Sequence, residues 1–171
     1  LAAQHKPYSL PLERGAPEGG FLCNRPCPDT IGAHRSIKMR VVHYLNQFFG
    51  GIGSEEEAGT PPQVRPGAVG PGRALDQALP EGSHVVSTIV CGDNYAAEHP
   101  EEIAALAVAT VRDAGADLLV AGPCFQAGRY GAAAGAMCNA VQAQLRVPAV
   151  TGMAVENPGV DIYHGEIYII D

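Results

Sequence analysis

Apolar strand-like runs alternate with helical stretches along the second half of the chain, and this alternation constrains the fold more than any other feature. Residues 117–122 (DLLVAG) form a nearly continuous apolar run, which is typical of a strand buried on both faces. The stretch before it, 100–114, opens with proline and two glutamates and repeats apolar residues three and four positions apart. Because strands separated by helices form right-handed βαβ units, the pattern predicts a parallel sheet.

The same patterns give a set of expected elements. Strands are expected at residues 40–46, 84–91, 117–122, 147–151 and 166–170. Helices are expected at 72–79, 100–114 and 128–145, and a long Gly- and Pro-rich loop over 47–72. The last strand is a candidate for an antiparallel edge strand. We therefore predict a doubly wound, mostly parallel α/β sheet of Rossmann-like or flavodoxin-like type, in three αβα layers.

The composition of the chain changes near residue 39. Residues 1–38 hold five prolines and four glycines without a sustained apolar period, so we expect an irregular arm that is disordered or loosely docked. Met39 stands directly before the first strand-like run, and one hypothesis is that it is the natural start and that the arm is not native. Residues 39–171 suffice for one α/β domain. Cys23 and Cys27 lack further ligands at a zinc-site spacing, so no metal site is predicted.

Charge and cysteine usage exclude several classes of function. The chain of 171 residues has 11 Lys and Arg against 18 Asp and Glu, and it has no basic cluster of the kind that binds nucleic acid. No apolar run is long enough to cross a membrane, and the first residues lack the apolar core of a signal peptide. Five widely spaced cysteines do not indicate a disulfide framework, so we expect a cytoplasmic protein.

Polar residues and glycines concentrate in the four segments that follow the predicted strands. In open α/β sheets, ligands bind beyond the carboxyl ends of the strands, so these segments are expected to surround one cleft. The candidate binding residues in them are Asn46, Gly50, Gly51, Asp93, Asn94, Arg129, Tyr130, Glu156 and Asn157. Backbone amides and asparagine side chains would orient a small substrate, and Arg129 would hold its carboxylate in a bidentate manner.

Each of these segments also has a simpler interpretation. The glycines after the first strand could form a phosphate cradle, but the dinucleotide fingerprint requires glycine where Glu56 stands, and a turn or hinge explains them as well. Asp93 and Asn94 could cap a helix, and the pair at 129–130 could lie on the surface. Cys124 precedes a helix start, a place that lowers a thiol pKa, although a buried inert thiol is the competing interpretation.

Five strings of the sequence together resemble one enzyme family. They are residues 39–56 (MRVVHYLNQFFGGIGSEE), 69–75 (VGPGRAL), 91–102 (CGDNYAAEHPEE), 122–131 (GPCFQAGRYG) and 147–163 (VPAVTGMAVENPGVDIY). In this order and spacing they resemble the N-terminal part of the B-component selenoprotein subunit of glycine, sarcosine and betaine reductases. Residues 1–38 have no counterpart in the resemblance, and Ser54 stands where it predicts glycine.

The resemblance implies an oxidoreductase complex that carries out a reductive deamination. A small amine such as glycine is activated on a pyruvoyl-bearing partner subunit, a selenocysteine of the B subunit displaces the amine, and a small selenoprotein carries the product onward. Thioredoxin supplies electrons, and acetyl phosphate is the eventual product. The family's selenocysteine lies in the later half of a longer subunit. The resemblance therefore assigns no catalytic residue to this chain and makes it an N-terminal fragment that we expect to be inactive alone.

The resemblance leaves the substrate and the role of this domain open. Glycine, sarcosine and betaine are all candidates, and no cofactor is expected in this chain itself, because the implied pyruvoyl group belongs to the partner subunit. One alternative is a non-catalytic assembly module that docks the pyruvoyl subunit. Another is a flavodoxin-like domain that binds a nucleotide or flavin. We also expect the protein to form oligomers.

Overall fold

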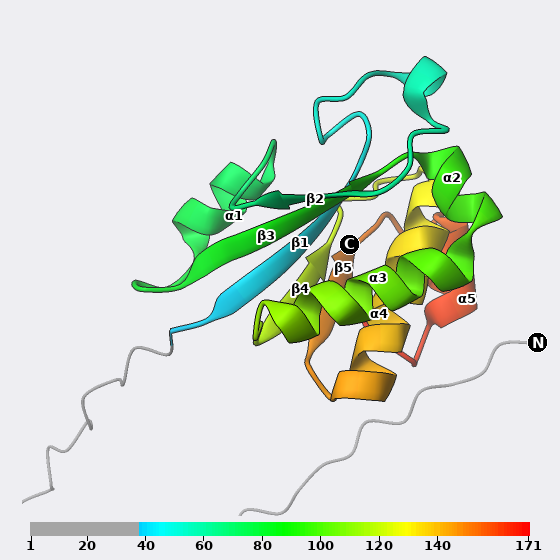
Figure 1. Cartoon of the computed structure of the whole chain (residues 1–171). Helices are drawn as coiled ribbons and strands as arrows, with labels where there is room; N and C mark the ends of the chain where they lie inside the picture. Colours follow the sequence, from blue (N-terminus) through cyan, green and yellow to red (C-terminus); the bar gives the residue numbers. More distant parts are fainter. Residues whose placement is uncertain (1–37) are drawn as a thin grey trace, which may run out of the picture. The chain divides into compact units, whose positions relative to one another are not determined.

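A six-stranded sheet forms the centre of the part of the chain that the structure describes, residues 38–171 of a computed structural model (Figure 1). Its strands are β1 (Arg40–Asn46), β2 (Gln63–Pro66), β3 (His84–Cys91), β4 (Leu118–Ala121), β5 (Ala149–Gly152) and β6 (Tyr168–Ile170). The helices are α1 (Gly72–Ala78), α2 (Asp93–Glu98), α3 (Pro100–Asp113), α4 (Gly128–Leu145) and α5 (Pro158–Tyr163), with the 3-10 turn η1 (Glu55–Glu57). The predicted arm, including Cys23 and Cys27, lies outside the described residues.

The strands follow the order β2-β3-β1-β4-β5-β6 across the sheet, and β2–β3 is the one antiparallel pair among them. When the five parallel strands are numbered alone, this order reads 2-1-3-4-5, which is the flavodoxin-like arrangement. β1 lies inside the sheet, with β3 on one side and β4 to β6 on the other. The predicted doubly wound, mostly parallel α/β fold is confirmed.

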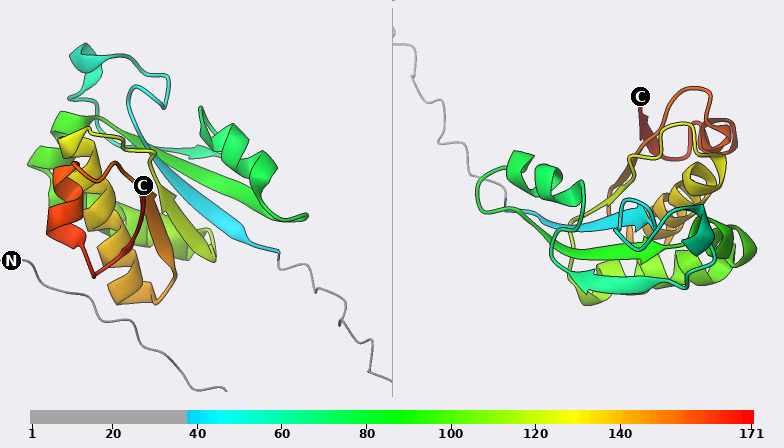
Figure 2. Two further views of the ribbon diagram at one scale, coloured as in Figure 1. Left: turned by 180° about the vertical axis from the view of Figure 1, so that it is seen from behind. Right: turned by 90° about the horizontal axis from the view of Figure 1, so that it is seen from above.

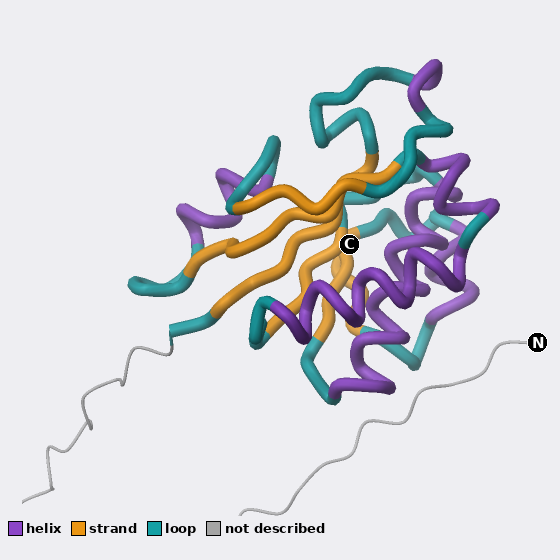
Figure 3. The backbone as a smooth tube through the Cα atoms, in the orientation of Figure 1, coloured by secondary structure: helices purple, strands orange, loops and turns teal. Residues whose placement is uncertain are grey.

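The position of the antiparallel strand was predicted wrongly. The last strand, β6, is parallel to β5, and the antiparallel edge strand is β2, which lies inside the segment expected to be loop. Figure 3 shows that the chain between β1 and β2 is loop, except for the short 3-10 turn η1. β2 has only four residues and ends in proline, so it lacks the apolar alternation of a buried strand. An edge strand tolerates proline because one side of its backbone needs no partner strand.

Helices cover the two faces of the sheet unequally. His43 and Tyr44 are neighbours in β1, so their side chains point to opposite faces. Tyr44 lies in the main core with Met137 of α4 and Ile103 of α3, whereas His43 lies beside Leu75 of α1. Figure 2 shows α1 on one side of the sheet and α3 with α4 on the other. The three αβα layers are therefore present, but the layer formed by α1 extends over the β1–β3 side only.

The long helices match their predicted positions, and two short helices fall where only turns or caps were expected. α3 and α4 carry long apolar patterns, and their starts coincide with the predicted ones. α5 begins at Pro158, and its N-cap residue Asn157 accepts a hydrogen bond from the Gly159 amide to Oδ1 at 2.9 Å. Helices of six residues show too little periodicity to be distinguished from a turn by sequence alone.

Candidate functional site

The long loop after β1 is fastened to the loop after β3 by backbone hydrogen bonds. The amide of Gly92 donates to the carbonyl of Thr60 at 2.9 Å, and the amides of Asn94 and Tyr95 both donate to the carbonyl of Ala58, at 2.9 and 3.1 Å. A Cβ atom at Gly92 would overlap the Ala58 carbonyl, so this close approach requires glycine. The loop between β1 and β2 is thus held in a fixed position beside the start of α2.

Two side chains at the end of β1 form hydrogen bonds with Asp93, the first residue of α2. Asn46 donates from Nδ2 to Oδ2 of Asp93 at 3.0 Å, and its Oδ1 accepts from the amide of Phe49 at 3.0 Å. Gln47 accepts from the amide of Asp93 to Oε1, also at 3.0 Å. All three polar residues, Asn46, Gln47 and Asp93, are buried. The carboxyl ends of β1 and β3 are adjacent in the sheet, which is why these residues meet.

The second carboxylate oxygen of Asp93 is unpartnered. Its Oδ1 is buried and has no hydrogen-bond partner among residues 38–171. Burial raises the pKa of Asp93 above its ordinary value; the hydrogen bond from Asn46 and the charge of Arg129 oppose this shift, and Glu55 adds to it. A buried acceptor without a donor is costly. Oδ1 is therefore suited to accept a hydrogen bond from a ligand.

A cavity of about 300 Å³ opens beside Asp93 at the carboxyl ends of the strands. Aromatic rings form part of its wall: the ring centroid of Phe49 lies 5.8 Å from that of Phe125 and 6.4 Å from that of Tyr130. Phe125 is exposed and has a φ of +48°, a backbone conformation that is uncommon for a residue other than glycine. The lining residues are Asn46, Gln47, Phe48, Phe49, Ser54, Glu55, Asp93, Cys124, Phe125, Ala127 and Tyr130.

The thiol in this cavity is buried and its pKa is raised. Cys124 is buried, its Sγ lies 3.7 Å from Oγ1 of Thr151, and burial raises its pKa to about 12. The interpretation that a helix start lowers this pKa is wrong, because burial raises it; the competing interpretation, a buried thiol, agrees with the structure. No group of three or more metal-ligating side chains occurs within residues 38–171.

Three of the predicted binding residues line the cavity, and a fourth lies at its edge. Asn46, Asp93 and Tyr130 are in the lining; Tyr130 is buried and its hydroxyl donates to the carbonyl of Tyr44 at 3.4 Å. Arg129 is exposed and donates from Nη2 to Oε1 of Glu55 at 2.6 Å, which connects the start of α4 to the β1–β2 loop.

The other predicted residues lie outside the lining. The amide of Gly50 donates to the carbonyl of Asn46 at 2.8 Å, and Gly51 has a φ of +70°, so both shape the turn after β1. Asn94 is bound through its backbone to the β1–β2 loop, and Glu156 is exposed. None of these four residues lines the cavity.

Asn157 lies outside the cavity lining and binds the loop that carries Phe125. Its Nδ2 donates to the carbonyls of Phe125 at 2.9 Å and Ala127 at 3.2 Å, while its Oδ1 caps α5. One buried amide therefore fixes the β4–α4 loop that carries Phe125. Sequence reasoning missed Gln47 and Phe125 as site residues. The sequence contained a sign of each residue. Gln47 directly follows Asn46 at the end of a predicted strand, and Phe125 is a large aromatic residue in a glycine-flanked loop after another strand.

Comparison with known proteins agrees with the resemblance. Residues 38–171 match the model of the family described as Glycine/sarcosine/betaine reductase selenoprotein B (GRDB). The chain belongs to this family. It is 53% identical over 133 residues to the glycine reductase complex component B subunit gamma of Symbiobacterium thermophilum, and 51% identical over 134 residues to the sarcosine reductase complex component B subunit beta of Peptoclostridium acidaminophilum. The betaine reductase complex component B subunit beta of the latter organism is 41% identical over 131 residues.

These matches cover most of this chain but a much smaller share of each relative. They include 78% of this chain in the first two relatives and 77% in the third, but only 31%, 31% and 30% of the relatives themselves. The chain thus spans about a third of the length of the reductase subunits that it matches. No solved structure matches the chain. These relatives are named as components of glycine, sarcosine and betaine reductase complexes.

Proposed function

We propose that this domain recognises the amine substrate in the B subunit of a glycine, sarcosine or betaine reductase complex. The reaction is the reductive deamination of a small amine or amino acid, with thioredoxin as electron donor and acetyl phosphate as eventual product. A pyruvoyl group on a partner subunit would supply the carbonyl chemistry that activates the amine. The small selenoprotein of the complex would carry the product onward. The part of the reaction assigned to this chain is binding and orientation of the substrate.

The free Oδ1 of Asp93, beside an aromatic wall, is the observation that carries this proposal. An ammonium group can donate to Oδ1, because Asn46 already holds Oδ2. The rings of Phe49 and Phe125 line the same cavity, and they would contact the cation and its methyl or methylene groups. Betaine has no N–H to donate, so it would rely on the rings and on the charge of Asp93 alone. The site therefore favours glycine and sarcosine over betaine.

Arg129 completes the proposed recognition of an amino acid. Only its Nη2 is bonded to Glu55, so the remaining guanidinium N–H groups can donate to the substrate carboxylate at the edge of the cavity. Asp93 and Arg129 would then hold the two charged ends of the substrate. A small zwitterion fits this pair of opposite charges, whereas a phosphate would face the negative charges of Asp93 and Glu55.

Calorimetric titration of the chain with glycine, sarcosine and betaine tests the proposal. We expect binding of glycine and sarcosine, and we expect Asp93→Asn to weaken it roughly ten- to a hundredfold, because a hydrogen bond between charged groups is lost. The matched control is Asp161→Asn, which neutralises an exposed carboxylate on α5. Equal affinity for glycine in both variants would contradict the role of Asp93. No binding of any of the three amines, combined with binding of the pyruvoyl subunit, would favour the assembly module.

We also propose a cytoplasmic location for the complex. No helix in the described part of the chain is long and apolar enough to span a membrane. The three cysteines of this part, Cys91, Cys124 and Cys138, are free thiols. Free thiols are typical of reducing compartments. Fractionation of cells with an antibody against the chain tests the location.

A further inference from the structure

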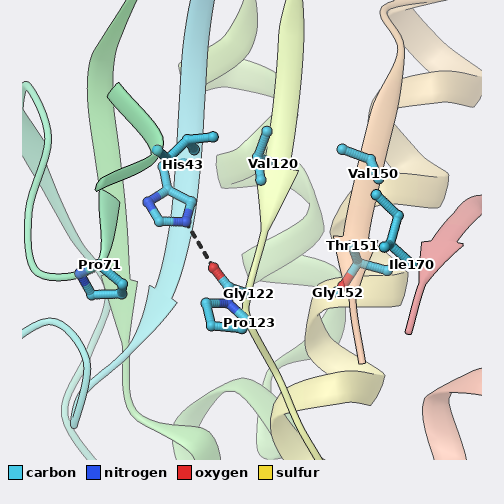
Figure 4. A pocket seen from close by; sticks show the side chains of 10 residues that line it. His43, Pro71, Val120, Gly122, Pro123, Val150, Thr151, Gly152 and Ile170 are labelled. Atoms are coloured by element: carbon cyan, nitrogen blue, oxygen red, sulfur yellow. Dashed lines mark hydrogen bonds between the residues drawn. The ribbon is translucent and has the colours of Figure 1, made fainter. Parts of the chain in front are cut away.

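The face of the sheet that carries α1 is open over β4, β5 and β6. A cavity of about 250 Å³ lies there, on the opposite side of the sheet from the main core. Figure 4 shows the side chains of His43, Val120 and Val150 side by side across the strands, with Ile170 beyond them. The lining residues are His43, Pro71, Leu75, Val120, Gly122, Pro123, Val150, Thr151, Gly152 and Ile170. We call this surface the α1-side groove.

The strands under this groove are apolar on both faces. In β4, Leu119 and Ala121 are buried towards α3 and α4, whereas Leu118 and Val120 are only half-buried on the groove side. Val150 of β5 is likewise half-buried. The exposure rises further in β6, where Tyr168 is 74% and Ile170 61% exposed. The prediction that residues 117–122 are buried on both faces is therefore correct for one face and wrong for the other.

The lining of the groove is largely apolar, and the one buried side-chain polar atom in it without a hydrogen-bond partner among residues 38–171 is Nδ1 of His43. His43 donates from Nε2 to the carbonyl of Gly122 at 2.7 Å, which leaves Nδ1 as the unprotonated nitrogen. That Nδ1 lies against Gly72 at the start of α1, where an added Cβ would come within 2.6 Å of it. The hydroxyl of Thr151 is next to the thiol of Cys124. No charged residue lines the groove, so an apolar occupant fits it best.

We propose that, in a subunit as long as the relatives, one α-helix from outside the matched segment covers the α1-side groove. Strands β4 to β6 span two interstrand spacings of about 4.8 Å, so the open face is roughly 10 Å wide, which is about the diameter of one helix. The flavodoxin-like order of the parallel strands requires helices on both faces. The relatives contain enough additional polypeptide for such a helix, because more than two thirds of their length lies outside the match. The helix would carry aliphatic residues towards Val120 and Val150.

A chimera allows a direct test. In it, residues 38–171 of this chain replace the matched segment of the Symbiobacterium thermophilum subunit. A cysteine is introduced by Val150→Cys into both the chimera and this chain, and this chain also carries Cys23→Ser and Cys27→Ser. The rate at which a maleimide labels the new cysteine is then compared between the two proteins. We expect labelling to slow roughly tenfold or more in the chimera, because the helix protects the groove. The control is Val64→Cys on edge strand β2, where valine is 48% exposed; it should label equally in both proteins.

Thermal unfolding gives a second readout and also reports whether the chimera folds. Val150→Lys should lower the melting temperature of the chimera by ~5 °C or more, since a charge would be buried under the helix, and change that of the isolated chain little. Val64→Lys should change neither. Equal labelling of the Val150→Cys thiol in both proteins, or equal effects of the lysine, would overturn the proposal. Protection that appears in the isolated chain as its concentration rises would instead assign the groove to a second copy. Neither result bears on amine binding by Asp93, which lies outside this groove.

Discussion

The side chain of Asn46, at the end of β1, donates from Nδ2 to Oδ2 of Asp93, the first residue of α2, over a distance of 3.0 Å. Both residues are buried, and 47 positions separate them in the sequence. The bond fixes the orientation of the Asp93 carboxylate and leaves Oδ1 without a hydrogen-bond partner among residues 38–171. The proposed recognition site depends in this way on the packing of β1 beside β3.

The variant Asn46→Asp should destabilise the protein. It keeps the shape of the side chain but places a carboxylate oxygen where the Nδ2 donor stood, 3.0 Å from Oδ2 of Asp93. Two buried carboxylates cannot both ionise at this distance. We expect the free energy of unfolding at pH 7 to fall by about 2–4 kcal/mol, measured by urea denaturation.

A surface pair provides the matched control for this variant. Asn139 donates from Nδ2 to Oε2 of Glu166 at 3.1 Å in an exposed position. Asn139→Asp should therefore cost no more than about 0.5 kcal/mol. The double variant Asn46→Asp with Asp93→Asn restores one donor and one acceptor and should recover most of the stability. If the two single variants lost equal amounts, the buried bond would not have the importance assigned to it.

Long periodic segments could be predicted from sequence, whereas short ones could not. β1 and β3 are apolar runs of seven and eight residues, and both begin and end where predicted. β2 has four residues, two of them charged or amide, and its pairing with β3 depends on tertiary contact alone. Asn46 and Asp93 were expected at one cleft because parallel strands bring their carboxyl ends together. Their direct bond and the place of Phe125 depend on side-chain geometry, which no periodicity encodes.

The stability of the protein should depend on pH through Asp93. Its pKa is raised in the folded state, chiefly by burial, so the folded protein binds a proton more tightly than the unfolded chain does. Its contribution to stability is complete below the unfolded value near 3.8 and is lost as the pH rises through the folded pKa. The free energy of unfolding of Asp93→Asn, minus that of the parent, should therefore increase with pH in this range and then level off. Urea titrations at a series of pH values measure this difference. The exposed Asp161→Asn should give a difference that is flat with pH, and a flat curve for Asp93→Asn as well would disprove the assignment.

The thiols of the described domain should not react while it is folded. Burial raises the pKa of Cys91 and Cys124 to about 12 and that of Cys138 further, so thiolate is scarce at pH 8. In a background of Cys23→Ser and Cys27→Ser, Ellman's reagent should detect almost no fast thiol in the native protein and three after guanidinium unfolding. Val64→Cys should add one fast thiol as a positive control. Rapid native reaction, abolished by Cys124→Ser, would show instead that the cavity contains a reactive thiol.

Gly135 should resist substitution although it lies within helix α4. Alanine favours a helix over glycine by about 1 kcal/mol, so Gly135→Ala would stabilise an exposed helix. Here an added Cβ would overlap the ring of Tyr163 on α5. The rigid ring cannot yield without moving α5, and overpacking of this kind costs about 1–3 kcal/mol. We therefore expect a net loss of stability in thermal unfolding. Combining Gly135→Ala with Tyr163→Leu should make the alanine neutral or favourable relative to Tyr163→Leu alone, because the obstructing ring is gone; if alanine costs the same in both backgrounds, the contact between α4 and α5 does not explain the glycine.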